Sequence, residues 1–407
     1  MRVLWFSLTP SNFAAQRGGY NGCGWISSLE TAISKREDVE LGIAFFDRTE
    51  TNPVTIGRTT YFPMRRAMSK VARIDRFFRI SAQDRVELGL AKEVVEQFLP
   101  DVIQVFGTES SFGLLASETD IPVVIHLQGL LGPSLNAWVP PGYDMADYAK
   151  RGNANPVQTI LGMRAIAFNR HAAARERRIM DHCRYFMGRT EWDRAFVSAF
   201  APQARYFNVW ETLRPCFYEP AEWKAPENPV FVSTVSGPLY KGHDMVLKTA
   251  KALQTSGLSD FKWRVFGVSD LSLAERKTGI RAKDVGVVAE GVVSAEELRE
   301  ALLEASVYVH PSYIDNSPNS ICEAQILGVP VVATNVGGVS SLFSPDRVNC
   351  LVPSNDPLMA AARICEALHA PATFIVDRDS IHRRHDPAAI SDNLADVWHN
   401  IMAGKGG

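Results

Sequence analysis

Short apolar runs alternate with longer amphipathic segments along most of the chain. The runs at 102–106 and 307–310 have the length of buried strands, and each is followed by a turn-forming residue. Other segments have helical spacing, with Ile26, Leu29 and Ile33 on one helix face. Strands that alternate with helices in this way predict an α/β protein with parallel sheets.

A cluster of prolines interrupts this alternation. Four prolines lie between residues 205 and 229. Because proline lacks the backbone N–H and ends regular elements, the cluster predicts a boundary between two β/α series. We therefore expect a first domain over residues 1–205, a second over 206–385, and a last segment over 386–407.

The most informative stretch is residues 311–338, PSYIDNSPNSICEAQILGVPVVATNVGG. It predicts a polar loop, a short helix over 321–327 and a strand over 331–333. Ser317 is the expected N-cap, and Pro318 is the expected first helical residue. The first-turn N–H groups and the helix dipole together make a site for a phosphate or diphosphate. The candidate binding residues are Asn316, Ser317, Pro318, Asn319 and Ser320.

Two carboxylates frame this loop with D-x7-E spacing. Asp315 precedes the predicted helix, and Glu323 lies about one turn inside it. A nucleotide whose phosphates met the helix N-terminus would bring its ribose near Glu323, whose carboxylate can accept from two vicinal hydroxyls. The alternative is that Glu323 offsets the helix dipole and that Asp315 caps a turn. The spacing alone does not decide between these roles.

This stretch resembles the E-x7-E region of the retaining glycosyltransferases of family 4, through DNSPNSICEA followed by GVPVVATNVGG. The resemblance extends over most of the chain. It implies the GT-B fold, in which two Rossmann-like β/α/β domains face each other across a deep cleft. It also implies that the first domain binds the acceptor, the second binds a nucleotide-sugar, and the helix in 386–407 packs back on the first. Asp315 replaces the usual first Glu, which keeps the charge but shortens the reach by one methylene.

A second phosphate-binding element is expected in the turn at 236–244. This turn contains glycine and Lys241, whose ammonium group suits phosphate binding as a point charge. The spacing of a P-loop is absent, so the turn is not an NTPase signature. The turn resembles the family's R-x4-K-G turn, which implies that Lys241 neutralises the leaving diphosphate. Ser236 stands in the place of the Arg, so another cation must substitute or the donor is held less tightly.

The first domain contributes a glycine-rich loop and polar residues at strand ends. The resemblance places Gly18 and Gly19 at the donor's phosphates, although a plain flexible connection explains a glycine-rich loop equally well. His126, at the end of a predicted strand, is either a hydrogen-bonded structural residue or, by the resemblance, a contact of the reacting sugar. Glu109 and Gln128 are acceptor-site candidates because ligands gather at strand ends.

The resemblance also implies that main-chain groups at a strand end of the second domain contact the base, with Gly291 and Val292 as candidates. Main-chain contacts do not reveal which base is bound, so UDP- and GDP-linked donors stay open. No D-x-D carboxylate pair follows a predicted strand. The sequence therefore predicts no metal ion and no cofactor besides the donor.

Composition excludes several classes of protein. The chain has 407 residues, 46% of them hydrophobic and 22% charged, which is typical of a soluble globular protein. A net charge of -2 gives no general attraction to nucleic acid. The six cysteines are scattered, which favours free thiols in a reducing cytoplasm. The start of the chain leads into a strand and no apolar run reaches about 18 residues, so neither a signal peptide nor a spanning helix is expected.

One segment, residues 58–79, is strongly basic. Aromatic and apolar residues are interleaved with its charges, which permits contact with an anionic membrane surface at the inner face of the membrane. The alternative is a solvated basic face over a buried apolar side. The charged residues are Arg58, Arg65, Arg66, Lys70, Arg73, Arg76 and Arg79, with Asp75 as the single acid.

These features together predict a metal-independent hexosyltransferase. It would move a sugar from a nucleotide-sugar to a hydroxyl of a saccharide or lipid-linked saccharide, in the synthesis of surface polysaccharide or glycoconjugate. The resemblance implies retention by front-face attack, without a protein nucleophile. One alternative is a nucleotide-sugar epimerase of the same fold, and another is a non-catalytic nucleotide-sugar-binding subunit. A nicotinamide dehydrogenase is disfavoured because the G-x-G-x-x-G fingerprint is absent.

Overall fold

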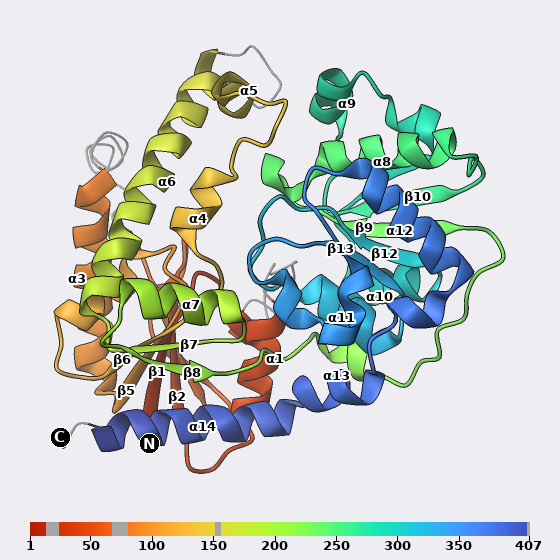
Figure 1. Ribbon diagram of the computed structural model, residues 1–407. Helices are drawn as coiled ribbons and strands as arrows, with labels where there is room; N and C mark the ends of the chain where they lie inside the picture. The colour runs from red at the N-terminus through yellow and green to blue at the C-terminus, as the bar shows by residue number, and fades with distance from the viewer. Residues whose placement is uncertain (14–23, 67–79, 151–155, 405–407) are drawn as a thin grey trace. The chain divides into compact units, whose positions relative to one another are not determined.

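The structure, a computed structural model, places the two β/α series in separate units (Figure 1). The residues it describes are 1–13, 24–66, 80–150 and 156–404. The first unit comprises Met1–Leu135, Ile166–Thr212 and His385–Gly407, and the second comprises Asn136–Ala165 and Leu213–Arg384.

The sheet of the first unit has eight strands within the described residues, in the order β3-β4-β2-β1-β5-β6-β7-β8. All neighbouring strands are parallel except β3 and β4. The strands are β1 (Arg2–Phe6), β2 (Glu40–Phe46), β3 (Val54–Ile56), β4 (Thr59–Met64), β5 (Val102–Phe106), β6 (Val123–His126), β7 (Tyr185–Gly188) and β8 (Arg205–Asn208).

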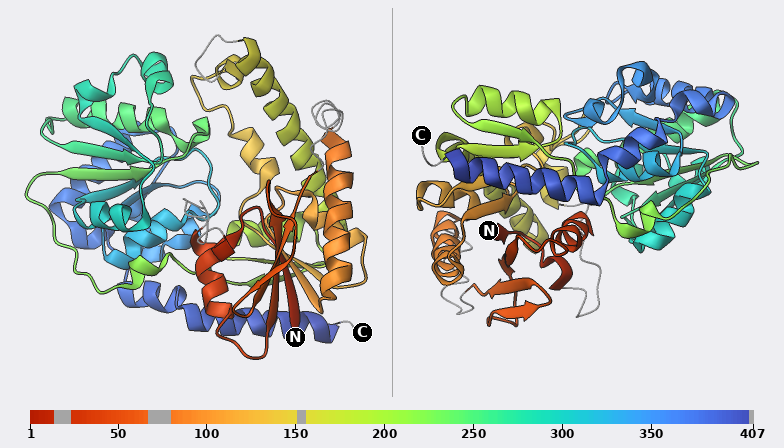
Figure 2. Two further views of the ribbon diagram at one scale, coloured as in Figure 1. Left: turned by 180° about the vertical axis from the view of Figure 1, so that it is seen from behind. Right: turned by 90° about the horizontal axis from the view of Figure 1, so that it is seen from below.

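Helices cover both faces of this sheet (Figure 2). Alternate residues of β1 explain why both faces need cover, since Leu4 packs in one apolar cluster and Trp5 in the other. One face packs against α1 and α14, and the other against α3, α6 and α7. The helices are α1 (Gly24–Ile33), α3 (Ile80–Phe98), α4 (Leu131–Asn136), α6 (Pro156–His182), α7 (Glu191–Phe200) and α14 (Pro387–Ala403).

The last helix, α14, completes the core of the first unit. Trp398 has no exposed area, and its indole Nε1–H donates to Gln104 Oε1 of β5 at 3.0 Å. Gln104 is itself fully buried, so this bond satisfies an amide that would otherwise be costly to bury. The contact joins the centre of the sheet to a helix 294 residues later in the chain.

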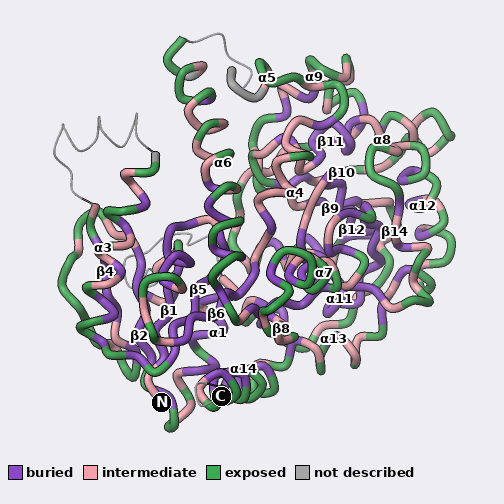
Figure 3. Tube along the Cα trace, turned by 60° about the vertical axis from the view of Figure 1, so that its left-hand side comes forward, coloured by how far each residue is buried: buried purple, intermediate pink, exposed green. Residues whose placement is uncertain are grey.

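The second unit contains a six-stranded parallel sheet within the described residues, in the order β11-β10-β9-β12-β13-β14. Its strands are short, and the central ones are mostly buried, as the purple tube in Figure 3 shows at β9 and β12. The strands are β9 (Val230–Thr234), β10 (Lys262–Phe266), β11 (Val287–Gly291), β12 (Val307–His310), β13 (Val331–Thr334) and β14 (Leu351–Val352).

Helices of the second unit follow the strands in β/α order. α8 packs against α9 and α12, whereas α11 packs against α10 and α13. The helices are α5 (Met145–Lys150), α8 (His243–Thr255), α9 (Ser272–Thr278), α10 (Ala295–Leu303), α11 (Asn319–Leu327), α12 (Pro357–His369) and α13 (Arg378–Arg384).

The segment Asn136–Ala165 groups with the second unit, although it precedes the proline cluster. The Lys277 ammonium group lies 2.5 Å from Asp147 Oδ2, which ties α5 to α9. The sequence does not predict that this segment groups with the second unit, because the contact joins residues 130 positions apart.

Candidate functional site

The predicted phosphate-binding elements lie at one edge of the second sheet. β9 and β12 are neighbouring parallel strands, so the loops that follow them leave the sheet on the same side. The loop after β9 carries Ser236 and Lys241, and the loop after β12 carries residues 315–318 and leads into α11 at residues 319 and 320. This is the carboxyl edge of the sheet, where open α/β sheets bind their ligands.

Two glycines let the surrounding loops approach closely. An added Cβ on Gly242, whose φ is +83°, would lie 2.1 Å from the Pro311 carbonyl oxygen. An added Cβ on Gly337, whose φ is +53°, would lie 2.0 Å from the Asp315 carbonyl oxygen. The same oxygen accepts the Gly338 N–H at 3.1 Å. A side chain at either position would push the loops apart.

Lys241 and Asp315 form an ion pair at this edge, with 2.7 Å between Nζ and Oδ2. His310 Nε2 lies 3.2 Å from the same carboxylate oxygen. Burial alone would raise the pKa of Asp315, but Lys241 and His310 hold that pKa well below its ordinary value. Burial also opposes the charge of Lys241, yet Asp315 raises the pKa of the ammonium group. Both groups are therefore charged at neutral pH.

The helix α11 begins at Asn319, one residue after the predicted first helical residue Pro318 and two residues before the predicted helical segment 321–327. Its N-cap is Pro318, which has extended backbone (φ -66°, ψ 121°) and makes no side-chain capping hydrogen bond. The prediction of Ser317 as N-cap and Pro318 as the first helical residue is therefore wrong, because Pro318 stays extended. Asn316 and Ser317 are buried before the helix begins at Asn319. The Pro318 side chain therefore satisfies none of the first-turn N–H groups of α11, which depend on other partners.

The hydroxyl of Ser320, in the first turn of α11, is held by a chain of hydroxyls. The Tyr308 phenol donates to Ser320 Oγ at 2.7 Å, and Thr234 Oγ1 lies 2.7 Å from the same phenol oxygen. Tyr308 is fully buried, and burial raises the pKa of its phenol, so the group stays protonated. These bonds fix the first turn of α11 to β9 and β12.

Glu323 is buried on α11 and has a partner that the sequence did not indicate. Arg214 Nε and Nη2 donate to its two carboxylate oxygens at 2.7 and 2.8 Å. Burial raises the pKa of Glu323, and the bonds to Arg214 counteract that effect. Arg214 comes from the proline-rich stretch after Thr212, where no periodic pattern directs attention to a single side chain.

Ser236, Gly291 and Val292 lie at the same edge of the sheet. Ser236 is exposed, and its carbonyl oxygen accepts from His243 Nε2 at 2.7 Å. Gly291 ends β11, and both of its backbone groups are used: its N–H donates to Val268 O and its carbonyl accepts from Gly267 N. The Val292 side chain is exposed. A base contact through the backbone of Gly291 or Val292 stays a prediction.

In the first unit, His126 ends β6 and has no exposed area. Its ring packs edge-on against Trp25 and stacks on Phe106, and its Nδ1 lies 3.3 Å from Gln104 Nε2. Burial, with the charge of Arg189, lowers the pKa of His126 to about 3, so the imidazole is neutral. These contacts fit the structural role that the sequence left open, and its predicted contact with the donor stays a prediction.

Gly18 and Gly19 lie outside the described residues, as do residues 67–79 of the basic segment. Two of the three arginines in the described part of that segment have partners in the structure. Arg66 Nε lies 2.7 Å from Glu87 Oε1, and its guanidinium lies over the Phe46 ring. Arg58 donates to the Glu37 carbonyl oxygen at 3.2 Å. The membrane-surface hypothesis therefore stays a prediction.

Glu109 follows β5 in the first unit and has an unusual carboxyl group. Its Oε2 atom is buried without a hydrogen-bond partner in the structure. Burial raises the pKa of Glu109 to about 7, and the nearby Glu176 carboxylate acts in the same direction. A carboxyl held near its point of half-ionisation can accept or donate a proton at neutral pH, which suits the acceptor-site prediction for this residue.

The raised pKa of Glu109 has a consequence for stability. The folded chain binds the proton more tightly than the unfolded chain, so this contribution is fully present below about pH 4.5 and is lost as pH rises to about 7. We expect Glu109→Gln to gain about 1–3 kcal/mol relative to the wild type between pH 5 and pH 8. Urea unfolding across this range measures the gain, and Glu93→Gln on the exposed face of α3 is the control. Equal pH profiles for wild type and Glu109→Gln would contradict the assignment.

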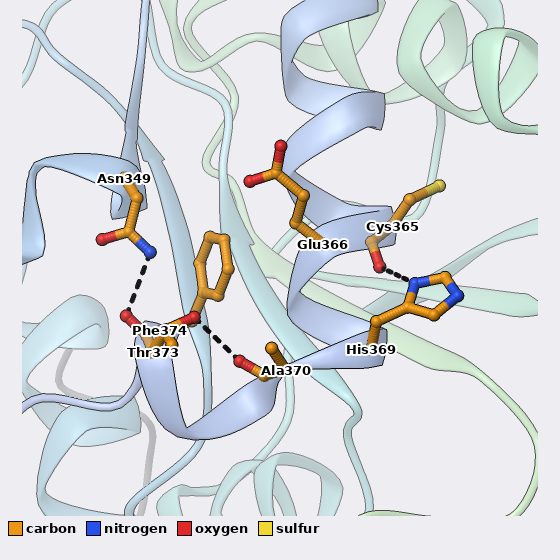
Figure 4. A pocket seen from close by; sticks show the side chains of 7 residues that line it. All are labelled: Asn349, Cys365, Glu366, His369, Ala370, Thr373 and Phe374. Carbon is orange, nitrogen blue, oxygen red and sulfur yellow. Dashed lines mark hydrogen bonds between the residues drawn. The ribbon is translucent and has the colours of Figure 1, made fainter.

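A separate pocket of about 390 Å³ lies in the second unit at the end of α12 (Figure 4). The Asn349 side chain donates to the Thr373 carbonyl oxygen across it, and His369 Nδ1 donates to the Cys365 carbonyl oxygen. Asn349 lines this pocket and comes just before β14, so the pocket lies at the amino edge of the sheet, opposite Lys241 and Asp315. The lining residues are Asn349, Cys365, Glu366, His369, Ala370, Thr373 and Phe374.

Metal, disulfide and membrane features were sought over the described ranges. No cluster of three or more His, Cys, Asp or Glu side chains there could hold a metal ion. The five cysteines in these ranges are free. Among the described residues, none of the helices combines the length and apolar character that crossing a bilayer requires.

Comparisons with known proteins agree with this geometry. Residues 227–370 match the family model described as Glycosyl transferases group 1. TuaC of Bacillus subtilis (strain 168), assigned as a teichuronic acid biosynthesis glycosyltransferase, is 39% identical over 77 residues. That match covers 19% of this chain and only 20% of the relative.

Two solved structures resemble nearly the whole chain. Sucrose-phosphate synthase from Thermosynechococcus elongatus has a TM-score of 0.72 at 13% identity and covers 99% of both chains. HepE of Anabaena, in complex with UDP-glucose, has a TM-score of 0.63 at 14% identity and covers 98% of this chain and 100% of its own. At such low identity these structures show the fold alone. The chain therefore has the two-domain GT-B fold, and its residues 227–370 match the glycosyl transferases group 1 family.

Proposed function

We propose that the protein is a retaining, metal-independent glycosyltransferase that moves a sugar from a nucleotide-sugar to an acceptor hydroxyl. The observation that carries the proposal is the meeting of Lys241, Asp315 and the N-terminus of α11 at one sheet edge, inside the segment matched by the family model. A partly buried ammonium group and a helix N-terminus are both suited to a diphosphate.

The relatives suggest the substrates. HepE binds UDP-glucose, which supports a UDP-linked donor here, with a GDP-linked donor as the alternative. TuaC is named for teichuronic acid biosynthesis, which supports a saccharide or lipid-linked acceptor in polysaccharide or glycoconjugate synthesis. The proposal includes no other cofactor. It places the reaction in the cytoplasm, with contact to the inner face of the membrane through residues 58–79.

The residues at the sheet edge take separate roles in this reaction. Lys241 and the first turn of α11 stabilise the negative charge that develops on the departing diphosphate. Asp315 holds the Lys241 ammonium group in place and faces the donor sugar. Glu323 accepts from the ribose hydroxyls. Retention follows front-face attack, in which the leaving phosphate takes the acceptor's proton, so the proposal includes no protein nucleophile.

A second candidate is a nucleotide-sugar-binding subunit without activity. The exposed Ser236 favours it, because the turn then provides one cation in place of two. NMR of the donor incubated with and without acceptor separates these functions. Transfer requires both molecules, slow donor hydrolysis would still indicate catalysis, and isomerisation of the donor alone would indicate an epimerase.

Thermal stability with UDP, GDP and ADP tests the donor site. A ligand at about 100 times its dissociation constant stabilises the folded state by roughly 2.7 kcal/mol, which is a clear shift in Tm. We expect one nucleotide to produce this shift in the wild type and to lose it in Glu323→Ala. No shift with any nucleotide would contradict the proposed donor site.

A further inference from the structure

Arg214 enters the second unit one residue before a 3₁₀ turn at Pro215–Tyr218. Proline favours extended backbone in the residue before it, and Arg214 has φ -66° and ψ 143°. The turn packs against α10 and α11. The main chain therefore delivers the Arg214 side chain to α11 in a defined direction.

The guanidinium group of Arg214 is fixed by interactions with Glu323 and Phe217. The guanidinium makes two parallel hydrogen bonds to Glu323, at 2.7 and 2.8 Å, which is the strong bidentate form of this ion pair. It also lies 5.0 Å from the centre of the Phe217 ring, within cation–π range. Only 4% of the Glu323 side chain is exposed, against 19% of Arg214. Of the two partners, the cation is the one that solvent reaches.

Charge at the site is balanced without ligand. Lys241 pairs with Asp315, and Arg214 pairs with Glu323, so each pair sums to zero. A nucleoside diphosphate brings at least two negative charges, and Ser236 offers none in return. A site with one cation would hold such a ligand weakly, so a second cation near α11 has an electrostatic purpose.

The spacing of residues along α11 allows Arg214 to act as this second cation. Glu323 lies four residues after Asn319, which is about 6 Å along the axis of α11. This is about the distance between the ribose hydroxyls and the phosphates of a nucleotide. A guanidinium at Glu323 is therefore within reach of a diphosphate at the helix N-terminus.

We propose that Arg214 supplies the second cation for the donor's diphosphate, and that Glu323 positions it. This inference rests on the proposed function and deepens it. In this arrangement the second cation comes from the stretch that enters the second unit, in place of the Arg of the R-x4-K-G turn after β9. A carboxylate offers about four lone-pair positions, so Glu323 can hold Arg214 and still accept from a ribose hydroxyl.

The test compares UDP with uridine, or the corresponding pair if GDP or ADP is the nucleotide that binds the wild type. Both are titrated by ligand-observed NMR against the wild type, Arg214→Gln, Ser236→Arg and the double variant. Loss of one charge-assisted contact should weaken UDP binding about ten- to a hundredfold in Arg214→Gln, while uridine binding changes less than about threefold. Adding Ser236→Arg should restore most of the lost UDP affinity, because it returns a cation to the turn after β9.

Three results would overturn the proposal. Equal losses for UDP and uridine would mean that Arg214 acts only on the ribose through Glu323. Unchanged UDP binding in a folded Arg214→Gln would mean that Arg214 has a purely structural role. Failure of Ser236→Arg to restore the lost UDP affinity would mean the same. If Arg214→Gln does not fold, Arg214→Lys carries the test, because it keeps the charge but loses the bidentate pairing with Glu323, and equal losses for UDP and uridine there would contradict the proposal. Absence of nucleotide binding by the wild type would instead overturn the proposed function, and this inference with it.

Discussion

Replacing Lys241 with alanine should lower the rate of sugar transfer by about a hundred- to a thousandfold. The ammonium group is positioned before the reaction by Asp315 at 2.7 Å and therefore needs no reorganisation as the leaving group becomes charged. Removal of one such preorganised group from an active site typically costs a factor of this size in kcat. Initial rates of UDP release in the presence of acceptor measure the effect.

The control for this variant is Lys224→Ala, which removes an exposed cation from the same unit. Surface ion pairs contribute little, so its rate should stay within about twofold of the wild type. Because Lys241→Ala leaves Asp315 without its cation, its folding must be checked by circular dichroism. A folded Lys241→Ala with a rate near that of Lys224→Ala would contradict the role of Lys241 at the leaving group.

Replacing Trp398 with alanine should destabilise the first unit by about 3–5 kcal/mol. The substitution removes a fully buried indole from the contact between α14 and the sheet, which leaves a cavity. It also leaves the buried Gln104 amide without the donor that satisfies its oxygen. Urea unfolding followed by circular dichroism measures the shift of the first-unit transition.

Asn400→Ala is the matched control on the same helix. Asn400 is exposed and bonds only within α14 in the structure, so its loss should cost less than about 0.5 kcal/mol. Trp398→Phe should fall between the two, since it keeps most of the apolar volume but loses the N–H. Equal unfolding midpoints for Trp398→Ala and Asn400→Ala would show that α14 is not part of the core.

The sequence predicts the strand–helix–strand unit around α11 well, since apolar runs and turn residues are local signals. Its expected strand at 307–310 is β12, and its expected strand at 331–333 lies within β13. The predicted N-cap of α11 was wrong by one residue because loop conformation depends on distant contacts. The fit of Gly337 against the Asp315 carbonyl oxygen is one such contact.

The candidate site was predictable where it follows from topology. Lys241 and Asp315 are 74 residues apart, but both follow neighbouring parallel strands and so meet at one edge. Arg214 and Glu323 are 109 residues apart, and one partner lies in a proline-rich stretch without periodicity. The Trp398–Gln104 bond, across 294 residues, likewise has no local signal. Side-chain pairing of this kind depends on tertiary structure that a single sequence does not reveal.

The position of α14 has a consequence for the order in which the protein folds on the ribosome. Domains made first usually fold first during synthesis. Here the first unit lacks Trp398 and its neighbours until α14 has been made, whereas residues 213–384 of the second unit are all made before α14. Until then, of the described helices only α1 covers that face of the N-terminal sheet, so we expect nascent chains that stop before α14 to expose apolar surface and to bind chaperones.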